Sequence, residues 1–267
     1  MSNQEILEKM KNERLGEENY NNFGTLMKIV EYNKTSDVWV EFQDEYKEKA
    51  HTDYRWFKKG NVKNPYDKEV CGVGYIGVGK YKVSENGKHT KAYEIWKAML
   101  KRCYNSYCLN KQPTYTDCYV CELWHCYQNF AKWYEKEIYE CKDEKMCLDK
   151  DILIKGNKIY SPETCVFVPN RINVLFTKSN KIRREYPIGV NYCKRGNKLQ
   201  VNCNIYENGK KKQKHLGYFP LNKPFQAFTC YKEFKENYIK QVADEYKNLI
   251  PNKLYEAMYK YQVEIND

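Results

Sequence analysis

The sequence lacks any long hydrophobic run, and no apolar stretch in its 267 residues approaches 18 residues. An α-helix needs about 20 such residues to cross a bilayer, so we expect no membrane-spanning segment and no membrane partner. The first residues, MSNQEILEKMKNERLG, are charged and amphipathic and lack the apolar region of a secretory signal. These absences predict a soluble protein that stays inside the cell.

Cysteine is abundant, but the conditions that favour disulfides are missing. The chain has 12 cysteines and no secretion signal, and disulfides persist mainly in oxidising compartments. We interpret the cysteines as reduced thiols that pack as small apolar residues. Cys118-x-x-Cys121 could belong to a zinc site, but a closed site takes four ligands, usually as two close pairs, and no second CxxC occurs. We therefore do not expect structural zinc.

The net charge of +11 is concentrated in one part of the chain. Residues 178–240 contain fifteen Lys and Arg against four Asp and Glu, so the remainder of the chain is neutral. Aromatic residues such as Tyr192 and Tyr218 are interleaved with these cations. This combination indicates a polyanion partner, and the alternative is a solvated basic face. The cations that we assign to the partner on charge alone are Arg183, Arg184, Lys211, Lys212 and Lys214.

The pattern of apolar residues predicts an α+β protein. Residues 25–66 alternate apolar and polar positions, which predicts a small β module of the SH3-like kind. The glycine-rich run at 72–81 does not open a helix, as a nucleotide-binding loop would, and we interpret it as a flexible linker. Residues 91–104 and 125–140 have the apolar spacing of core helices. We divide the chain into three segments, 1–86, 87–180 and 181–267.

After Pro187 the pattern changes from helices to strands. Strands are predicted at 188–195 and within 198–219, where Asn208-Gly209 is a strong hairpin turn. Pro224 then begins a long amphipathic helix, and Pro251 ends it.

Residues 146–176, MCLDKDILIKGNKIYSPETCVFVPNRINVLF, have the order of parts of a ββα-metal nuclease site. A strand ends in acidic residues, a Gly-Asn loop leads to a second short strand, and a helix with asparagines follows. In such sites one divalent cation stabilises the leaving oxygen while a histidine deprotonates water. Hard oxygen ligands favour Mg²⁺ or Mn²⁺. The candidate polar groups are Asp149, Asp151, Asn157, Asn170 and Asn173.

The run SPETCVFVPNRIN resembles in spacing the "PEN-L-R-W-V-T, three residues, N" run of phage HNH homing endonucleases, and residues 91–178 are similar to that family. The resemblance implies metal-dependent hydrolysis or nicking of duplex DNA in the cytoplasm of a phage host. It places Asp149 and Asn173 at the metal ligands and Thr164 at the asparagine that ends the loop. Asn157 would shape the loop.

Lys150 is the departure from this family, because the resemblance places it where the general base histidine stands. A lysine base needs its pKa lowered by several units, whereas two flanking aspartates would keep it protonated. We therefore expect Lys150 to act on a phosphate as a cation while another group serves as base. Alternatively, the site has kept the fold and lost the chemistry.

Residues 186–240 resemble DNA-binding domains of the APETALA/ethylene-response-factor type. The landmarks are Gly189-Val190, the strand Leu199 to Ile205, Leu216-Gly217-Tyr218-Phe219 and Ala227-Phe228. The resemblance implies a three-stranded sheet packed on one helix, with its strands in the major groove of double-stranded DNA. Leu199 stands where the family usually has an aromatic residue, and a bidentate contact from Arg195 would recognise guanine. The positions that the resemblance assigns to DNA are Lys194, Arg195, Lys198, Gln200 and Asn202.

Three functions follow from these observations. The first is a DNA-guided HNH-like endonuclease of phage origin, and the second is a non-catalytic DNA-binding protein such as a phage regulator. The third is an inhibitor of a host defence nuclease. The absent histidine favours the second function, whereas the acidic and asparagine ligands favour the first.

Overall fold

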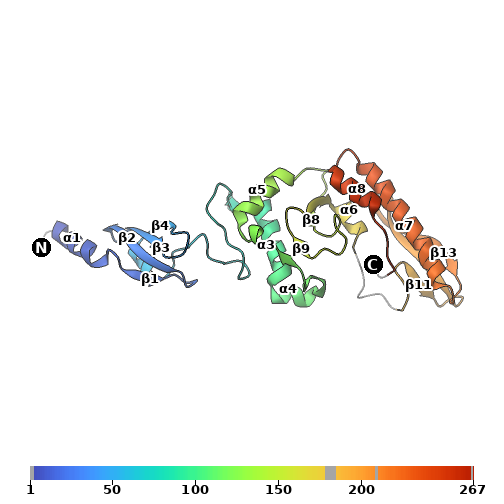
Figure 1. Ribbon diagram of the computed structural model, residues 1–267, viewed down its shortest axis with the longest axis horizontal. Coiled ribbons are helices and arrows are strands. Elements are labelled where there is room, and N and C mark those ends of the chain that lie inside the picture. Colours follow the sequence, from blue (N-terminus) through green and yellow to red (C-terminus); the bar gives the residue numbers. More distant parts are fainter. Residues whose placement is uncertain (1–2, 178–184, 208–209, 266) are drawn as a thin grey trace. The chain divides into compact units, whose positions relative to one another are not determined.

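The computed structural model describes residues 3–177, 185–207, 210–265 and 267. The chain divides into two compact units, and Figure 1 labels their helices and strands. Unit 1 comprises residues 1–136 with 158–161, and unit 2 comprises 137–157 with 162–267. Helices and several small sheets occur together, which confirms the predicted α+β class. None of the helices in the described ranges has both the length and the apolar composition of a membrane span.

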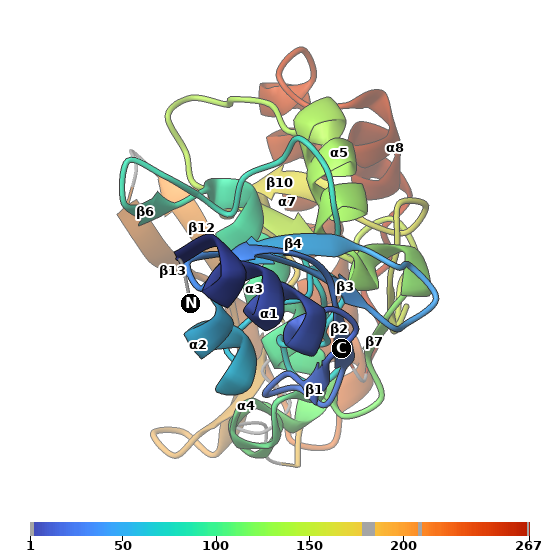
Figure 2. The same cartoon turned by 90° about the vertical axis from the view of Figure 1, so that its left-hand side faces the viewer.

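An N-terminal module begins unit 1, and Figure 2 shows α1 in front of its sheet. The strands form an antiparallel sheet in the order β1-β2-β3-β4. Alternate residues such as Met27, Ile29 and Val40 are buried, as the period of two requires. The alternation predicted for residues 25–66 is present in β2 and β3, which pair antiparallel, and the likeness to an SH3 barrel stays a prediction. The elements are α1 (Asn3–Arg14), β1 (Glu18–Tyr20), β2 (Leu26–Lys34), β3 (Asp37–Phe42), β4 (Lys49–Thr52) and α2 (Tyr54–Lys58).

Helices dominate the rest of unit 1, and α3 and α5 confirm the two helices predicted there. Trp96 of α3 is fully buried, and its Nε1 donates to the Trp124 carbonyl at 2.7 Å. Trp124 packs edge-on against Phe130 of α5. The elements are β5 (Ser84–Glu85), β6 (Lys88–His89), α3 (Lys91–Tyr104), α4 (Ser106–Lys111), η1 (Pro113–Tyr115), β7 (Tyr119–Val120), η2 (Glu122–His125), α5 (Tyr127–Glu137) and β9 (Ile159–Tyr160), the last parallel to β7.

The glycine-rich run at 72–81 is packed, which corrects its interpretation as a flexible linker. The Tyr75 N–H donates to the His125 carbonyl, and the Tyr127 N–H donates to the Tyr75 carbonyl, both at 2.9 Å. A Cβ on Gly74 would lie 2.4 Å from Leu100 Cδ1, so the backbone approaches α3 where only glycine fits. Gly74, Gly77 and Gly79 therefore serve close packing in unit 1.

In unit 2, β8 (Met146–Asp149) pairs antiparallel with β10 (Val166–Pro169), and α6 (Asn170–Leu175) follows directly. Asp149, the last residue of β8, lies opposite Val166. The order strand, loop, strand and helix is present as expected. The stretch around Ile159 pairs with β7 in unit 1 and takes no part in this two-stranded sheet.

The C-terminal part of unit 2 is a three-stranded antiparallel sheet packed on a helix, as predicted. Leu199, Val201 and Cys203 of β12 are buried against Phe228 and Tyr231 of α7. The turn predicted at 208–209 lies outside the described residues, although Glu207 and Lys210 beside it pair. The elements are β11 (Val190–Cys193), β12 (Lys198–Glu207), β13 (Lys210–Phe219), α7 (Pro224–Tyr246) and α8 (Asn252–Lys260).

One helix, α7, connects the two parts of unit 2. Its first half packs on the three-stranded sheet through Ala227 and Tyr231. Its second half, with Ile239 and Val242, packs in a second core with α6, α8, β10 and the start of β8. The 23-residue helix α7 contributes side chains to both cores and so joins them in one unit. The compact units therefore do not coincide with the three segments proposed from sequence.

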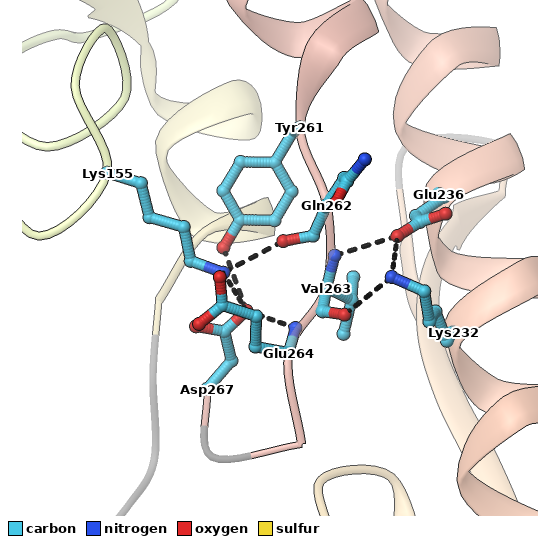
Figure 3. Close-up of polar contacts among 8 residues, drawn as sticks. All are labelled: Lys155, Lys232, Glu236, Tyr261, Gln262, Val263, Glu264 and Asp267. Atoms are coloured by element: carbon cyan, nitrogen blue, oxygen red, sulfur yellow. Dashed lines mark hydrogen bonds and ion pairs between the residues drawn. The ribbon is translucent and has the colours of Figure 1, made fainter.

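Residues 261–265 and Asp267 connect the two parts of unit 2 a second time, as Figure 3 shows. Val263 is buried in the core of the three-stranded sheet, and its carbonyl accepts from Lys232 Nζ of α7 at 2.8 Å. Lys155, from the loop after β8, donates to Asp267 Oδ2 at 2.7 Å. The segment thus connects the sheet core with the loop that follows Asp149.

Candidate functional site

The carboxylate of Asp149 is built into the turn that follows β8. Its Oδ1 accepts from the backbone N–H groups of Asp151 and Ile152, each at 2.8 Å. Burial raises the pKa of Asp149 above its ordinary value, and these two backbone donors oppose that effect only in part. Ionisation of Asp149 therefore costs folding free energy when no cation is bound, and a nearby cation would offset this cost.

Lys150 is buried and points back into the loop. Only 6% of its side chain is exposed, and its Nζ donates to Asp151 Oδ1 at 2.7 Å and to the Asn157 carbonyl at 2.8 Å. An ammonium that donates to a carboxylate and a carbonyl has no lone pair for a proton. This geometry gives no support to Lys150 as a base or as a phosphate contact. Lys150 instead ties the two ends of the loop together.

Asn157 completes the connection with Lys150 from the other side. Its Nδ2 donates to the Lys150 carbonyl at 2.8 Å, while its own carbonyl accepts from Lys150 Nζ. The two residues thus form a reciprocal pair that fixes the loop over seven residues. This is a loop-shaping contact, and the part of Asn157 in catalysis stays a prediction.

The helix asparagines lie in α6, which packs on β8. Asn170 Oδ1 accepts a weak bond from the Cys147 thiol, and Asn173 is half-buried in the middle of the helix. Within the described ranges, no three His, Cys, Asp or Glu side chains cluster in a way that could hold a metal ion. Asp149 and Asn173 would supply one carboxylate and one amide oxygen, and Mg²⁺ often uses so few protein ligands, with water and phosphate as the others.

The solvent-facing side of the three-stranded sheet is polar and nearly free of acid. Because Leu199, Val201 and Cys203 point to α7, the residues between them point away from it. Gln200 and Asn202 occupy these outward positions. The register sets Gln200 opposite Asn191 of β11 and Tyr218 of β13, and sets Asn202 opposite His215. In the three strands only Glu207 is acidic, and it is paired with Lys212 at the far end.

The outward side chains contact one another. Lys198 Nζ lies 3.7 Å from the centroid of the Tyr218 ring, whose centroid is 4.5 Å from that of His215. His215 Nδ1 lies 3.2 Å from Asn202 Oδ1 and 3.4 Å from Gln200 Nε2. We call Lys198, Gln200, Asn202, His215 and Tyr218 the sheet face. These contacts hold its polar groups in fixed positions.

The remaining predicted DNA contacts are divided between the two sides of the sheet. Lys194 and Arg195 are exposed in the turn between β11 and β12, and Lys211 is exposed opposite Tyr206, on the side of the sheet face. Lys212 and Lys214 pair with Ile205 and Cys203, which face α7, and Lys214 Nζ lies 4.9 Å from the centroid of the Phe234 ring. Arg183 and Arg184 lie outside the described residues.

Sequence reasoning missed His215 and did not assign Tyr218 to the site. A strict period of two would place residues 215 and 218 on opposite sides of a strand. The register shifts between Val201 and Asn202, which inserts Leu216 as an extra residue in β13. This bulge turns His215 and Tyr218 to the same side, so only the pairing reveals them.

Unit 2 thus combines a partly buried carboxylate turn at the end of β8 with a basic, amide-rich sheet face. Comparison of the chain with protein-family models, with curated proteins and with solved structures gave no match. The chemistry of these two sites is therefore the basis for a function.

Proposed function

We propose that this protein binds double-stranded DNA through the sheet face of unit 2. The observation that carries the proposal is the composition of that face. Amide, imidazole and phenol groups share one side of the sheet in a contact network, Lys194, Arg195, Lys198 and Lys211 lie on or beside it, and the only acid of the strands lies at the far end. Amides and imidazoles bond base edges, whereas lysines neutralise phosphates. Sheet strands are known to fit the major groove.

The proposal is tested by fluorescence anisotropy with the full chain and a labelled mixed-sequence duplex. Reversing the charge of Arg195 and Lys198 together should weaken binding by at least tenfold, because each loses a favourable phosphate or base contact. Reversing the charge of Lys59 and Lys68, two exposed lysines of unit 1, is the matched control and should change binding little. Equal losses in both pairs would mean that net charge, and not the sheet face, binds DNA.

A second candidate is metal-dependent phosphodiester hydrolysis at the end of β8, as in phage HNH endonucleases. The observation that favours it is Asp149, whose burial cost a divalent cation would offset. With Mg²⁺ or Mn²⁺, nicking of supercoiled plasmid should fall at least a hundredfold in Asp149→Ala and Asn173→Ala, and Asn170→Ala is the control. Tight duplex binding without nicking at either metal would leave a DNA-binding protein without catalysis.

Asp149→Asn tests the metal site without an activity measurement. Because burial raises the folded pKa, ionised Asp149 costs stability above that pKa, and the cost vanishes below the ordinary value of 3.8. Asparagine keeps the oxygen that accepts both backbone N–H groups. We therefore expect the variant to be at least as stable as wild type at pH 7, and to lose that advantage below about pH 4.

Magnesium should reverse this order. At a hundred times its dissociation constant, Mg²⁺ should stabilise the wild-type protein by about 2.7 kcal/mol and leave Asp149→Asn unchanged in thermal unfolding. An equal response of both proteins to Mg²⁺ would place the cation elsewhere.

A further inference from the structure

The hydrogen bonds of the sheet face give its amides a definite orientation. Gln200 Nε2 donates to Asn202 Oδ1 at 3.3 Å, and His215 Nδ1 lies 3.2 Å from the same oxygen. Asn202 Oδ1 is therefore the shared acceptor of the network, and Gln200 Nε2 is one of its donors. The orientation of each amide is fixed by these neighbours on the same face of the sheet.

Two polar groups of these side chains take no part in the bonds of the network. They are the Nδ2 amino group of Asn202, which is a donor, and the Oε1 atom of Gln200, which is an acceptor. Among the described residues, neither group has a protein partner, and the two side chains are joined directly by the bond between them. The centre of the sheet face thus offers one donor beside one acceptor.

This pair matches one base edge of the major groove. Adenine presents the N7 acceptor beside the N6 donor, whereas guanine presents two acceptors, N7 and O6. A donor beside an acceptor complements adenine and leaves one unfavourable contact against guanine. Tyr218, opposite Gln200 in the register and exposed, adds an apolar ring edge suited to a thymine methyl group.

We propose that the sheet face selects an A·T base pair, with Asn202 Nδ2 donating to adenine N7 and Gln200 Oε1 accepting from adenine N6. This inference rests on the proposed binding of duplex DNA and specifies its target. It is distinct from the guanine contact expected of Arg195, which lies in the turn between β11 and β12. His215 is a positioning residue, because it occupies Asn202 Oδ1 and keeps the amide from turning over.

The experiment begins with selection of duplexes from a randomised library by the full chain, followed by competition anisotropy on the selected site. One A·T pair should be preferred over G·C by roughly 5- to 150-fold, the discrimination of a good bidentate contact. Gln200→Ala and Asn202→Ala should each reduce this preference toward one at that position alone. Arg195→Ala is the control and should leave the preference at that position intact.

A change in the DNA tests the same contact independently of how the variants fold. Replacing the selected adenine with 7-deazaadenine removes N7, so wild-type binding should weaken at least fivefold, whereas Asn202→Ala should show no further loss. His215→Ala should lower the A·T preference more than the overall affinity, and His215→Asn, which retains a donor near Nδ1, should restore it.

The possible failures are distinguishable. If wild-type protein retains no duplex from the library, the proposed function is wrong. If it retains duplexes but the position sensitive to Gln200 and Asn202 prefers G·C or no base, only the selection of A·T is overturned. An unchanged affinity for 7-deazaadenine would also overturn it.

Discussion

Raising the salt concentration from about 50 mM to about 200 mM should weaken duplex binding by a factor of roughly 10². Seven cations lie on the described strands and turn of the sheet, and most of them are exposed. Each cation that meets a phosphate releases a counterion, and contacts by the four on or beside the sheet face, Lys194, Arg195, Lys198 and Lys211, give a loss of this size. Binding isotherms by anisotropy at a series of salt concentrations measure the slope. The seven cations are Lys194, Arg195, Lys198, Lys210, Lys211, Lys212 and Lys214.

Single substitutions give this prediction its control. Lys211→Gln removes one exposed cation of β13, and it should make the slope of log K against log salt shallower by about 0.9. Lys68→Gln removes an exposed cation of unit 1 and should leave the slope unchanged. A wild-type affinity that does not respond to salt would contradict phosphate contacts by these lysines.

Gly189→Ala should destabilise unit 2 by about 2–5 kcal/mol, the sum of overpacking and a left-handed backbone. Gly189 has φ +79°, and a Cβ there would lie 2.1 Å from Cδ2 of Tyr231. Tyr231 cannot move aside easily, since it is buried in the core between the sheet and α7. Denaturant unfolding followed by far-UV circular dichroism measures the loss.

Gly156→Ala is the matched control for this variant. Gly156 belongs to the same unit and has the same φ of +79°, but a Cβ there would meet nothing within 4 Å. It should therefore cost only the backbone strain, about 1–2 kcal/mol. Equal losses in the two variants would show that the contact with Tyr231 contributes little. Because β11 starts beside Gly189, the Gly189→Ala variant should also lose duplex binding.

The order of elements could be predicted from local sequence. The helical spacing around Trp96 and Phe130 and the alternation in β2, β3 and β12 each satisfy a short-range period, and these elements are present in the structure. The glycine run at 72–81 could not be interpreted in this way. Its glycines allow close approach to Leu100, more than twenty residues away, and composition alone does not distinguish such packing from a linker.

The candidate sites divide in a similar manner. Asp149, Gln200 and Asn202 could be selected from sequence because the two family resemblances assign those positions. Lys150 looked like an available cation, yet it is buried in a reciprocal pair with Asn157. The fold of the loop determines that partner, and the sequence alone does not.

The sequence by itself determined the elements, the concentration of positive charge and the outward residues of β12, because these depend on neighbours within a few positions. The tertiary structure decided three other features: the orientation of Lys150, the position of His215 and Tyr218 on the same side of the sheet, and the packing of two cores on the one helix α7. The orientation of Lys150 depends on how its own loop closes on Asn157, and the other two depend on pairing or packing between residues farther apart in the chain. Such contacts form only when the whole unit has folded.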